Sequence, residues 1–444
     1  MKHIVHPHIA RLAAAALTAL VVSACGDSPV PAGGLVPNPG GPGMPTSPPG
    51  NSSLRAPSLP TPDPDPFYAQ PASFSGTVPG QVLASRPITF APSGVAMSNE
   101  AWHLKYVSRD VNGQPIAAVA TVIKPTTPGT GAPVLLSYQF PINGLGLQCS
   151  ASHAMEGSTV NSTIQLETAN LLVALQAGYI VVTPDHLGPF SAYGTPRLAG
   201  QITLDGIRAA LNYAPLGLSS TTLIGAWGYS GGANATAWAA VLQQEYAPEL
   251  KLVAFATGGT PADGISIARA VDENPVTNAG FFSLVLSAIL GTNRSYPGLV
   301  TPILNARGLA TAESLKDGCG GGTSDGSAEP TGKLADYTTS ADPFNEPGVI
   351  ATQPFITLPL AGATPITDTF VYHSQIDELI PISGADAMVA AWCRDGAHVS
   401  YFRGVAGEHV AFQAATSPNV LAYLASRFAG SPVAVTPPGT TVCN

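Results

Sequence analysis

Apolar strand-like segments and helical stretches alternate through the middle of this chain, and the alternation limits its fold more than any other feature. The expected order is helix, strand, helix, strand, helix, strand at 164–177, 179–183, 202–213, 221–227, 233–246 and 252–256. Strands joined by helices run parallel, so the pattern predicts a mostly parallel central sheet with helices on both faces. Further strands are expected at 102–108, 116–123, 134–139, 369–373 and 399–402, and further helices at 385–393 and 410–428.

The alternation stops between residues 258 and 365, where apolar helical stretches, glycine turns and a loop around Cys319 occur. With 444 residues, 45% of them hydrophobic and 10% charged, the chain can bury one large core. We therefore expect an inserted helical cap at 258–365 and a core built from 67–257 and 366–444. Residues 281–290 are apolar around most of a helix circumference, which favours a buried cap helix over an exposed lid surface.

The charge of the chain argues against one class of partner. The net charge is -9, and the 18 Lys and Arg residues are scattered along the sequence. Proteins that bind phosphate backbones carry a basic patch or stripe. Nucleic acid is therefore not an expected partner.

The N-terminus has the layout of an export signal. Lys2 and Arg11 precede an apolar run at 12–22 that is too short to span a bilayer. We expect 1–24 to be a signal peptide, and Val22-Ser23-Ala24-Cys25 is similar to the lipobox of bacterial lipoproteins, whose cysteine is acylated. The Pro- and Gly-rich segment 25–66 would then be a lipid-anchored linker. The expected protein is a membrane-anchored lipoprotein of the periplasm or cell surface, or an extracellular protein.

The number of cysteines supports acylation of Cys25. Its removal from the five leaves an even set suited to two disulfides in an oxidising compartment, namely Cys149, Cys319, Cys393 and Cys443. The alternative is simple cleavage after Ala24, which leaves Cys25 as an unpaired thiol.

A serine is expected at a strand-to-helix turn in the alternating region. Gly228-Tyr229-Ser230-Gly231-Gly232 follows the strand at 221–227 and precedes the helix at 233–246. Glycines on both sides allow the tight turn that exposes a serine hydroxyl as a nucleophile. The same GxSxG pattern occurs at 322–326, and chance alone produces it on the order of once in so Gly-rich a chain. That second match has no strand before it and no helix after it, so Ser230 is the candidate nucleophile.

The base that activates Ser230 is expected downstream, because α/β-hydrolase folds carry their triad in the order Ser, Asp or Glu, His. His409 lies in a glycine-containing stretch between the last strand and the last helix. His373 ends a strand and precedes the best acid candidate, while His398 begins a strand and is expected to be fixed in the sheet. His409 is the predicted base.

The acid is expected between the nucleophile and the base. Asp377 follows the strand at 369–373 in a loop, and Glu378 is its neighbour and local rival. The predicted triad is Ser230, Asp377 and His409, and the predicted fold class is an α/β-hydrolase fold.

Donors for a developing oxyanion are expected beside the serine. The N–H of Gly231 follows the nucleophile and is one of them. The second is expected from the loop after the strand at 134–139, where Asn143 offers a backbone N–H and an amide side chain. An ordinary Asn-Gly turn accounts for the same residues equally well.

Together these residues resemble the secretory lipase family, a lipase A-like branch of the α/β-hydrolases. The likeness extends from about residue 102 to residue 443. Its more specific stretches are Ser137-Tyr138-Gln139, Asp185-His186-Leu187-Gly188, Leu204-Asp205-Gly206-Ile207-Arg208-Ala209, Gly228-Tyr229-Ser230-Gly231-Gly232-Ala233, Gly258-Gly259-Thr260-Pro261 and Asp377-Glu378-Leu379-Ile380-Pro381. By this resemblance, the family triad falls on Ser230, Asp377 and His409.

The resemblance also implies disulfides Cys149–Cys319 and Cys393–Cys443, the first of which would join the cap to the oxyanion loop region. The family pattern has an acidic residue where this chain has Asn143, which keeps a backbone donor and removes a carboxyl group. The chain ends just after Cys443, where related lipases can continue as a flap, so a more open acyl pocket is expected.

The predicted function is a lipase or carboxylesterase that cleaves carboxylic esters with an apolar acyl group through an acyl-enzyme, without a cofactor. The triad does not identify the leaving group, so a serine peptidase or acyltransferase is an alternative, as is a catalytically silent surface-binding lipoprotein. Asp185 and His186 could suggest a metal site, but no third ligand lies near them, and a hydrogen-bonded turn is expected. Asp205 and Arg208 are expected to form a local ion pair on a helix.

Overall fold

A computed structural model describes residues 56–274, 279–405 and 407–443 of the chain. The predicted signal peptide, the predicted anchor Cys25 and the linker up to residue 55 lie outside the described residues.

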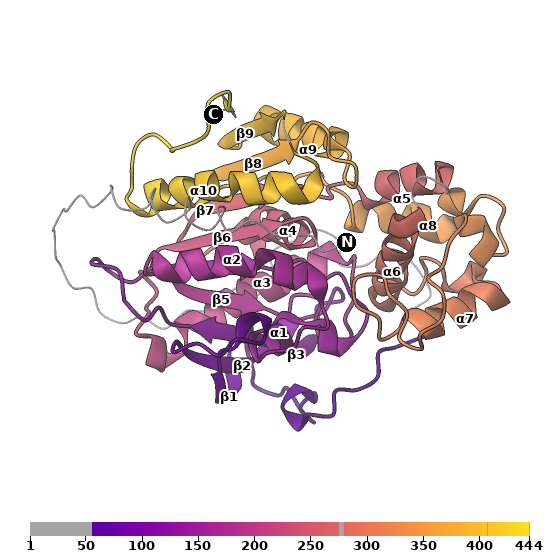
Figure 1. The fold of residues 1–444 in the computed structure, drawn as a ribbon, viewed down its shortest axis with the longest axis horizontal. Helices are drawn as coiled ribbons and strands as arrows, with labels where there is room; N and C mark the ends of the chain where they lie inside the picture. Colours follow the sequence, from indigo (N-terminus) through magenta and orange to yellow (C-terminus); the bar gives the residue numbers. More distant parts are fainter. Residues whose placement is uncertain (1–55, 275–278, 406, 444) are drawn as a thin grey trace, which may run out of the picture. The chain divides into compact units, whose positions relative to one another are not determined.

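The core is a single ten-stranded sheet in the order β1-β2-β3-β5-β4-β6-β7-β8-β9-β10 (Figure 1). Its strands are β1 Val82–Thr89, β2 Glu100–Arg109, β3 Pro115–Ile123, β4 Leu135–Gln139, β5 Ile180–Pro184, β6 Ile224–Tyr229, β7 Leu252–Gly258, β8 Thr369–Ser374, β9 Val399–Gly404 and β10 Thr441–Cys443. The six strands from β5 to β9 in this order are parallel, while β1, β2, β3 and β10 join antiparallel at the edges. Strands β4, β5 and β6 are buried along their whole length, as expected for a sheet covered on both faces.

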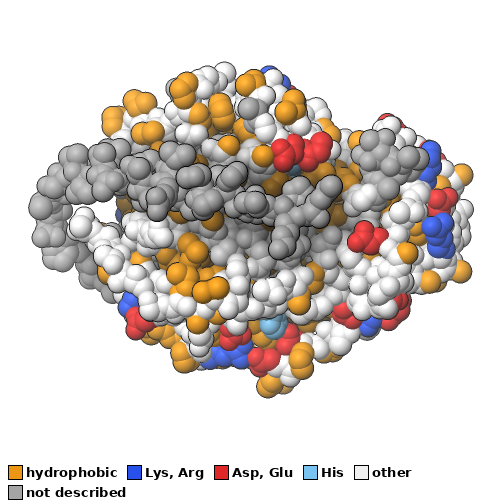
Figure 2. Space-filling model, in the orientation of Figure 1, with side chains coloured by type: hydrophobic (Ala, Val, Ile, Leu, Met, Phe, Trp, Pro, Cys, Tyr) orange, Lys and Arg blue, Asp and Glu red, His pale blue; other side chains and the backbone are white. Residues whose placement is uncertain are grey.

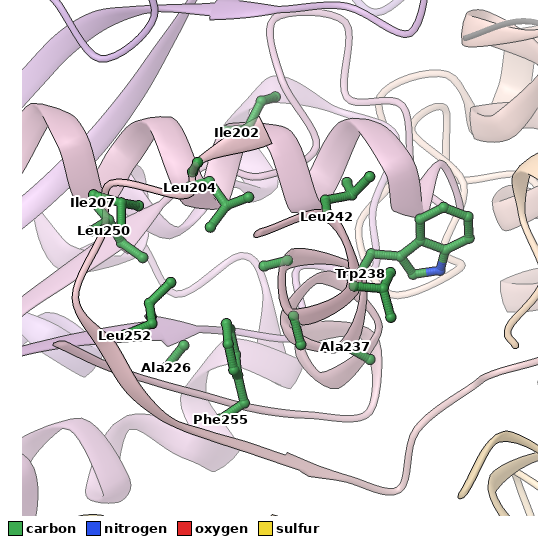
Figure 3. Close-up of a cluster of buried hydrophobic side chains, with 14 of the residues drawn as sticks. Ile202, Leu204, Ile207, Ala226, Ala237, Trp238, Leu242, Leu250, Leu252 and Phe255 are labelled. Carbon is green, nitrogen blue, oxygen red and sulfur yellow. The ribbon is translucent and has the colours of Figure 1, made fainter. Parts of the chain in front are cut away.

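Helices cover both faces of the sheet, and each face has its own hydrophobic core. One layer holds α1 Ala151–Met155, α2 Ser162–Gln176 and α10 His409–Phe428, and the other holds α3 Pro196–Leu211, α4 Gly231–Tyr246 and α9 Ile382–Arg394. Successive strand residues enter opposite cores, as Leu135 and Leu136 do, because side chains alternate along a strand. Figure 3 shows part of the second core, to which α3 contributes Ile202 and Ile207, α4 contributes Trp238 and β7 contributes Phe255.

The segment between β7 and β8, hereafter the insertion, carries four α-helices in its described residues, namely α5 Gly264–Glu273, α6 Ala279–Ser295, α7 Ala306–Leu315 and α8 Pro347–Thr352. They lie together beside the sheet (Figure 1). Phe282, Val285, Leu286 and Leu290 of α6 are buried in a hydrophobic cluster that belongs to this segment and includes Leu145 of the loop after β4. The helix expected at 281–290 is therefore a packed helix, as its apolar circumference predicted.

Disulfides join Cys149 to Cys319 and Cys393 to Cys443, as the resemblance implied. The first links the insertion to the segment after β4, where Leu145 N also donates to Gly318 O at 2.8 Å. The second ties β10 to the end of α9. Among the described residues, no helix has both the length and the apolar character needed to cross a bilayer.

The structure differs from the sequence predictions in several boundaries. Helix α3 begins at Pro196, six residues before the expected start, because proline is well suited to the first turn of a helix. Strand β6 begins at Ile224 rather than Thr221, since Thr222 N is bonded to Ser219 O in a turn. The edge strands β1 and β10 carried little apolar alternation and were not predicted. His409, which was expected in a loop, is the first residue of α10.

The end of the expected linker is bonded to the folded part of the chain. Thr61 donates from its N and Oγ1 to Asp317 of the insertion, each at 2.7 Å. Asp63 lies 2.8 Å from Nε2 of His153 in the core. Residues 58–65 thus connect the insertion and the core.

Figure 2 shows hydrophobic patches on the face that it draws, with the few Lys and Arg side chains near its margin.

Candidate active site

Ser230 lies in a strained turn between β6 and α4. Its φ of 53° and ψ of -123° are rare for a residue with a side chain, and they make Ser230 the pivot between strand and helix. The turn is held by the Ser230 N–H, which donates to Gly258 O at 2.9 Å. Glycine is required at 232, where a Cβ atom would lie 1.9 Å from Gln139 O. This is the geometry of a nucleophile elbow.

Asp377 and His409 come together at the ends of β8 and β9. His409 Nδ1 lies 2.7 Å from Asp377 Oδ2. The other carboxylate oxygen accepts the N–H groups of Leu379 at 3.1 Å and Ile380 at 2.7 Å. Burial alone would raise the pKa of Asp377, but hydrogen bonds from His373 and His409 outweigh it and hold this pKa well below its ordinary value. Asp377 is thus an ionised acceptor that fixes the imidazole with its proton on Nδ1.

Glu378, the rival acid, serves the same histidine at a different atom. Its Oε2 accepts the backbone N–H of His409 at 2.9 Å. An N–H in the first turn of a helix has no partner within the helix, and a carboxylate there is also favoured by the helix dipole. This contact explains why α10 begins at His409. The backbone carbonyl of His409 is bonded as well, because Tyr229 Oη donates to His409 O at 2.7 Å.

Ser230 and His409 line the same cavity, which has a volume of about 280 Å³. Among the described residues, Ser230 Oγ makes no hydrogen bond, so the bond to His409 Nε2 that proton transfer needs is not formed in this structure. Catalytic hydrogen bonds are often long or misaligned without substrate, and one rotatable bond sets the position of Oγ.

The second predicted oxyanion residue, Asn143, lies beside the nucleophile turn. Its φ of 44° places it in the left-handed region, and it is buried at the wall of the cavity. A Cβ atom at Gly231 would lie 2.3 Å from Asn143 Oδ1, so only glycine at 231 lets this side chain approach. Oδ1 is buried without a hydrogen-bond partner among the described residues. The structure thus brings Asn143 and Gly231 together.

The walls of the cavity are mostly apolar beyond these residues. The insertion contributes much of the apolar surface from α6 and the segments that follow it, including Phe281, Leu284, Val285, Ala288, Ile289, Leu299 and Val300. The core contributes the polar end, with Ser230, Gly231, His409 and Asn143. Ser230 therefore lies where the polar end of the cavity meets its apolar walls.

Glu167 of α2 is a buried carboxyl group at the cavity wall that the sequence analysis did not single out. Its Oε2 accepts the Tyr138 hydroxyl at 2.6 Å, and Asn170 Nδ2 donates to the same hydroxyl at 3.1 Å. Burial raises the pKa of Glu167 to about 8. No motif marks this residue, although an acid in an apolar helix after Leu166 could have suggested a buried group.

Asp185 and His186 form a structural turn, as expected. Asp185 accepts the N–H and the hydroxyl of Ser152 at 2.9 and 2.6 Å. His186 lines the cavity, and burial lowers its pKa to about 3, so the ring is neutral. The described residues hold no cluster of three or more His, Cys, Asp or Glu side chains arranged for a metal ion.

The expected Asp205–Arg208 ion pair is present at 2.7 Å. It is more than a local pair, because Asp205 also accepts the hydroxyls of Ser108 and Tyr246, each at 2.7 Å. This buried network connects β2, α3 and α4.

Known proteins resemble this chain over most of its length. The family model described as secretory lipase matches residues 153–435. A probable inactive lipase of Mycobacterium tuberculosis is 36% identical over 384 residues, covering 84% of this chain and 83% of the relative. A secreted triacylglycerol lipase of Malassezia furfur is 32% identical over 351 residues, covering 76% of this chain and 69% of the relative.

Solved structures show the same fold. Candida antarctica lipase A in its closed state superposes with a TM-score of 0.76 at 28% identity, covering 87% of this chain and 89% of that one. A rice cell wall degrading esterase from Xanthomonas oryzae superposes with a TM-score of 0.58 at 18% identity, covering 80% of this chain and 97% of that one, a likeness in fold alone. The predicted fold class and family resemblance are confirmed.

Proposed function

Because this chain belongs to the secretory lipase family and has the α/β-hydrolase fold, we propose that it hydrolyses esters through Ser230, His409 and Asp377. One observation carries the proposal. A serine in a strained nucleophile turn and a histidine bonded at 2.7 Å to a buried carboxylate line one cavity, although they are far apart in sequence.

The proposed reaction follows from the positions of these groups. Ser230 Oγ attacks the ester carbonyl while His409 Nε2 takes its proton, and Asp377 stabilises the resulting imidazolium. Collapse of the tetrahedral intermediate returns that proton to the leaving alcohol and gives an acyl-enzyme, which water then hydrolyses with His409 as base.

The oxyanion would be stabilised by two neighbouring groups. The Gly231 N–H begins α4 and is one donor, favoured further by the helix dipole. We propose Asn143 as the second, because the residue lies beside Gly231 at the cavity wall and its amide can donate through Nδ2. Replacement of Asn143 by Ala should lower kcat about tenfold or more with little change in KM, as measured on a soluble ester.

We propose that the acyl group of the substrate is apolar and lies in the cavity beneath the insertion. The apolar walls from α6 support this assignment, since an apolar chain gains by leaving water and a charged or peptide-like group would lose its hydration there.

Export is supported by relatives that are named as secreted lipases. We propose further that 1–24 is removed as a signal peptide and that acylated Cys25 anchors the enzyme to a membrane. In the producing cell, wild-type protein should partition into the membrane fraction and Cys25→Ser should not. Equal partition of the two proteins would exclude the anchor.

One relative favours a second candidate function. The M. tuberculosis protein is named as probably inactive, so a silent surface-binding protein with this fold is the alternative. The two candidates differ in the reactivity of Ser230.

Labelling by a fluorophosphonate decides between them. Wild-type protein and Ser324→Ala, which alters the second GxSxG match in an exposed loop, should both be labelled, and Ser230→Ala should not. Hydrolysis of a nitrophenyl ester should fall by orders of magnitude in Ser230→Ala and His409→Ala. Absence of labelling in the wild-type protein would favour the silent alternative. Labelling of Ser230→Ala would refute Ser230 as the nucleophile.

A further inference from the structure

A second histidine lies against the proposed catalytic carboxylate. His373, near the end of β8, is fully buried, and the proposed reaction does not use it. Its Nε2 lies 2.8 Å from Ile380 O and 3.4 Å from Asp377 Oδ2. Asp377 is therefore flanked by two imidazole rings, and its Oδ2 faces a nitrogen of each.

The surroundings of His373 identify its protonated nitrogen. Nε2 faces two acceptors, a carbonyl and a carboxylate, so it carries the hydrogen. Nδ1 is buried without a hydrogen-bond partner among the described residues, and a proton there would add an unsatisfied donor and a buried charge. His373 thus presents its Nε2–H to both acceptors.

The His373 N–H also contacts the loop that carries Asp377, in which Ile380 folds back onto the Asp377 carboxylate. Ile380 N donates to Asp377 Oδ1 at 2.7 Å, while Ile380 O accepts from His373. His373 is therefore connected to both oxygens of the carboxylate, to Oδ2 directly and to Oδ1 through Ile380. Rotation of the Asp377 carboxylate away from His409 would break several of these contacts at once.

We propose that His373 is a positioning residue that holds the Asp377 carboxylate in the orientation from which Oδ2 accepts the His409 Nδ1–H. The proposal rests on the proposed triad and adds a residue to it. His373 also contributes to the low pKa of Asp377, since its hydrogen bond favours the ionised carboxyl against the effect of burial.

Two variants distinguish the effect of the His373 N–H group from the effect of the ring itself. His373→Phe keeps a flat, apolar ring and removes the donor, whereas His373→Gln can place an amide N–H near the position of Nε2. We expect His373→Phe to lower kcat for a nitrophenyl ester about tenfold or more, the scale of one hydrogen bond to a charged group, with KM little changed. His373→Gln should recover a large part of this loss. The exposed His398, changed to Gln, is the matched control and should retain wild-type kcat.

A double-mutant cycle with Asp377→Asn tests whether His373 acts through the carboxylate. If it does, His373→Phe should cost much less kcat in the Asp377→Asn background than in the wild type. Proton NMR should show the downfield signal of the Asp377–His409 hydrogen bond in wild type and His373→Gln, and a shifted or broadened signal in His373→Phe. A merely structural histidine would lower the thermal midpoint but would leave the two effects additive and the signal in place.

The outcomes are distinct. Additive losses in the cycle, or wild-type kcat in His373→Phe, would overturn the positioning role while leaving the triad intact. Wild-type kcat in Asp377→Asn would instead refute the proposed triad. If His373→Phe does not fold, as judged by circular dichroism, His373→Gln is compared with His373→Asn, whose shorter amide does not reach Oδ2. Equal kcat for these two would also overturn the proposal.

Discussion

Single residues at this site owe their properties to what surrounds them, and Glu167 is the clearest case. It is buried among Tyr138, Asn170 and the cavity wall, and burial raises its pKa to about 8 from an ordinary value of 4.5. In the folded protein the group keeps its proton across neutral pH, where the unfolded chain has lost it. Between these two pKa values the folded state binds one more proton, so stability falls as pH rises, by about 1.4 kcal/mol per pH unit for this group.

Replacement of Glu167 by Gln should remove this pH dependence. Gln keeps the shape and the acceptor for Tyr138 but cannot ionise, so the thermal midpoint of the variant relative to wild type should increase steadily from pH 5 to pH 8. Thermal unfolding followed by circular dichroism at several pH values measures the difference. The exposed Glu100, changed to Gln, is the control. A constant difference between Glu167→Gln and wild type would show that Glu167 is ionised in the folded protein at neutral pH.

At the scale of elements, the partly buried guanidinium group of Arg294 joins the insertion to the core. Arg294 of α6 donates to the carbonyl oxygens of Leu145 and Phe190 at 2.7 Å, of Ser191 and Lys316 at 2.9 Å, and of Ser58 at 3.2 Å. Burial lowers the pKa of Arg294 to about 10, so the side chain stays charged at neutral pH. A guanidinium group satisfies several carbonyl groups at once, which the point charge of a lysine cannot match.

Replacement of Arg294 by Lys should therefore loosen the insertion. The variant leaves buried carbonyl groups unpaired, and we expect a loss of about 3 kcal/mol in unfolding free energy. Limited proteolysis should cut the insertion faster than in wild type. Arg394→Lys, at an exposed arginine of α9, should behave as wild type in both assays. Unchanged cleavage in Arg294→Lys would show that the disulfide Cys149–Cys319 and apolar packing suffice to hold the insertion.

At the scale of the whole molecule, the core provides the proposed catalytic groups and the insertion provides much of the apolar wall of the cavity. Ala288 of α6 lines this cavity, and its small side chain leaves space that a larger one would occupy. Ala288→Phe should lower kcat/KM for long-chain nitrophenyl esters about tenfold while leaving the acetate ester within about twofold of wild type. Ala310→Phe, on the exposed side of α7, is the control. Equal losses on short and long esters would place the acyl chain elsewhere.

Much of this arrangement could be predicted because it depends on local order along the chain. Apolar periodicity identified the parallel strands, and the strand and helix around Ser230 distinguished that serine from Ser324. The required order of the triad then reduced the choice of base to His409. Residue types and their spacing carry this information, since a strand-turn-helix unit is encoded by consecutive residues.

Only the tertiary structure decided which partners the side chains of the site contact. Asp377 and Glu378 are neighbours in sequence, yet Asp377 accepts the ring N–H of His409 and Glu378 accepts its backbone N–H. His373, Glu167 and Arg294 carry no motif, and their properties arise from burial and from partners up to 236 residues away. Sequence by itself determined the fold class and the family, and it identified Ser230 as the candidate nucleophile. The environment of each charged group was decided only when distant segments packed together, because desolvation and hydrogen bonding depend on neighbours in space rather than in sequence.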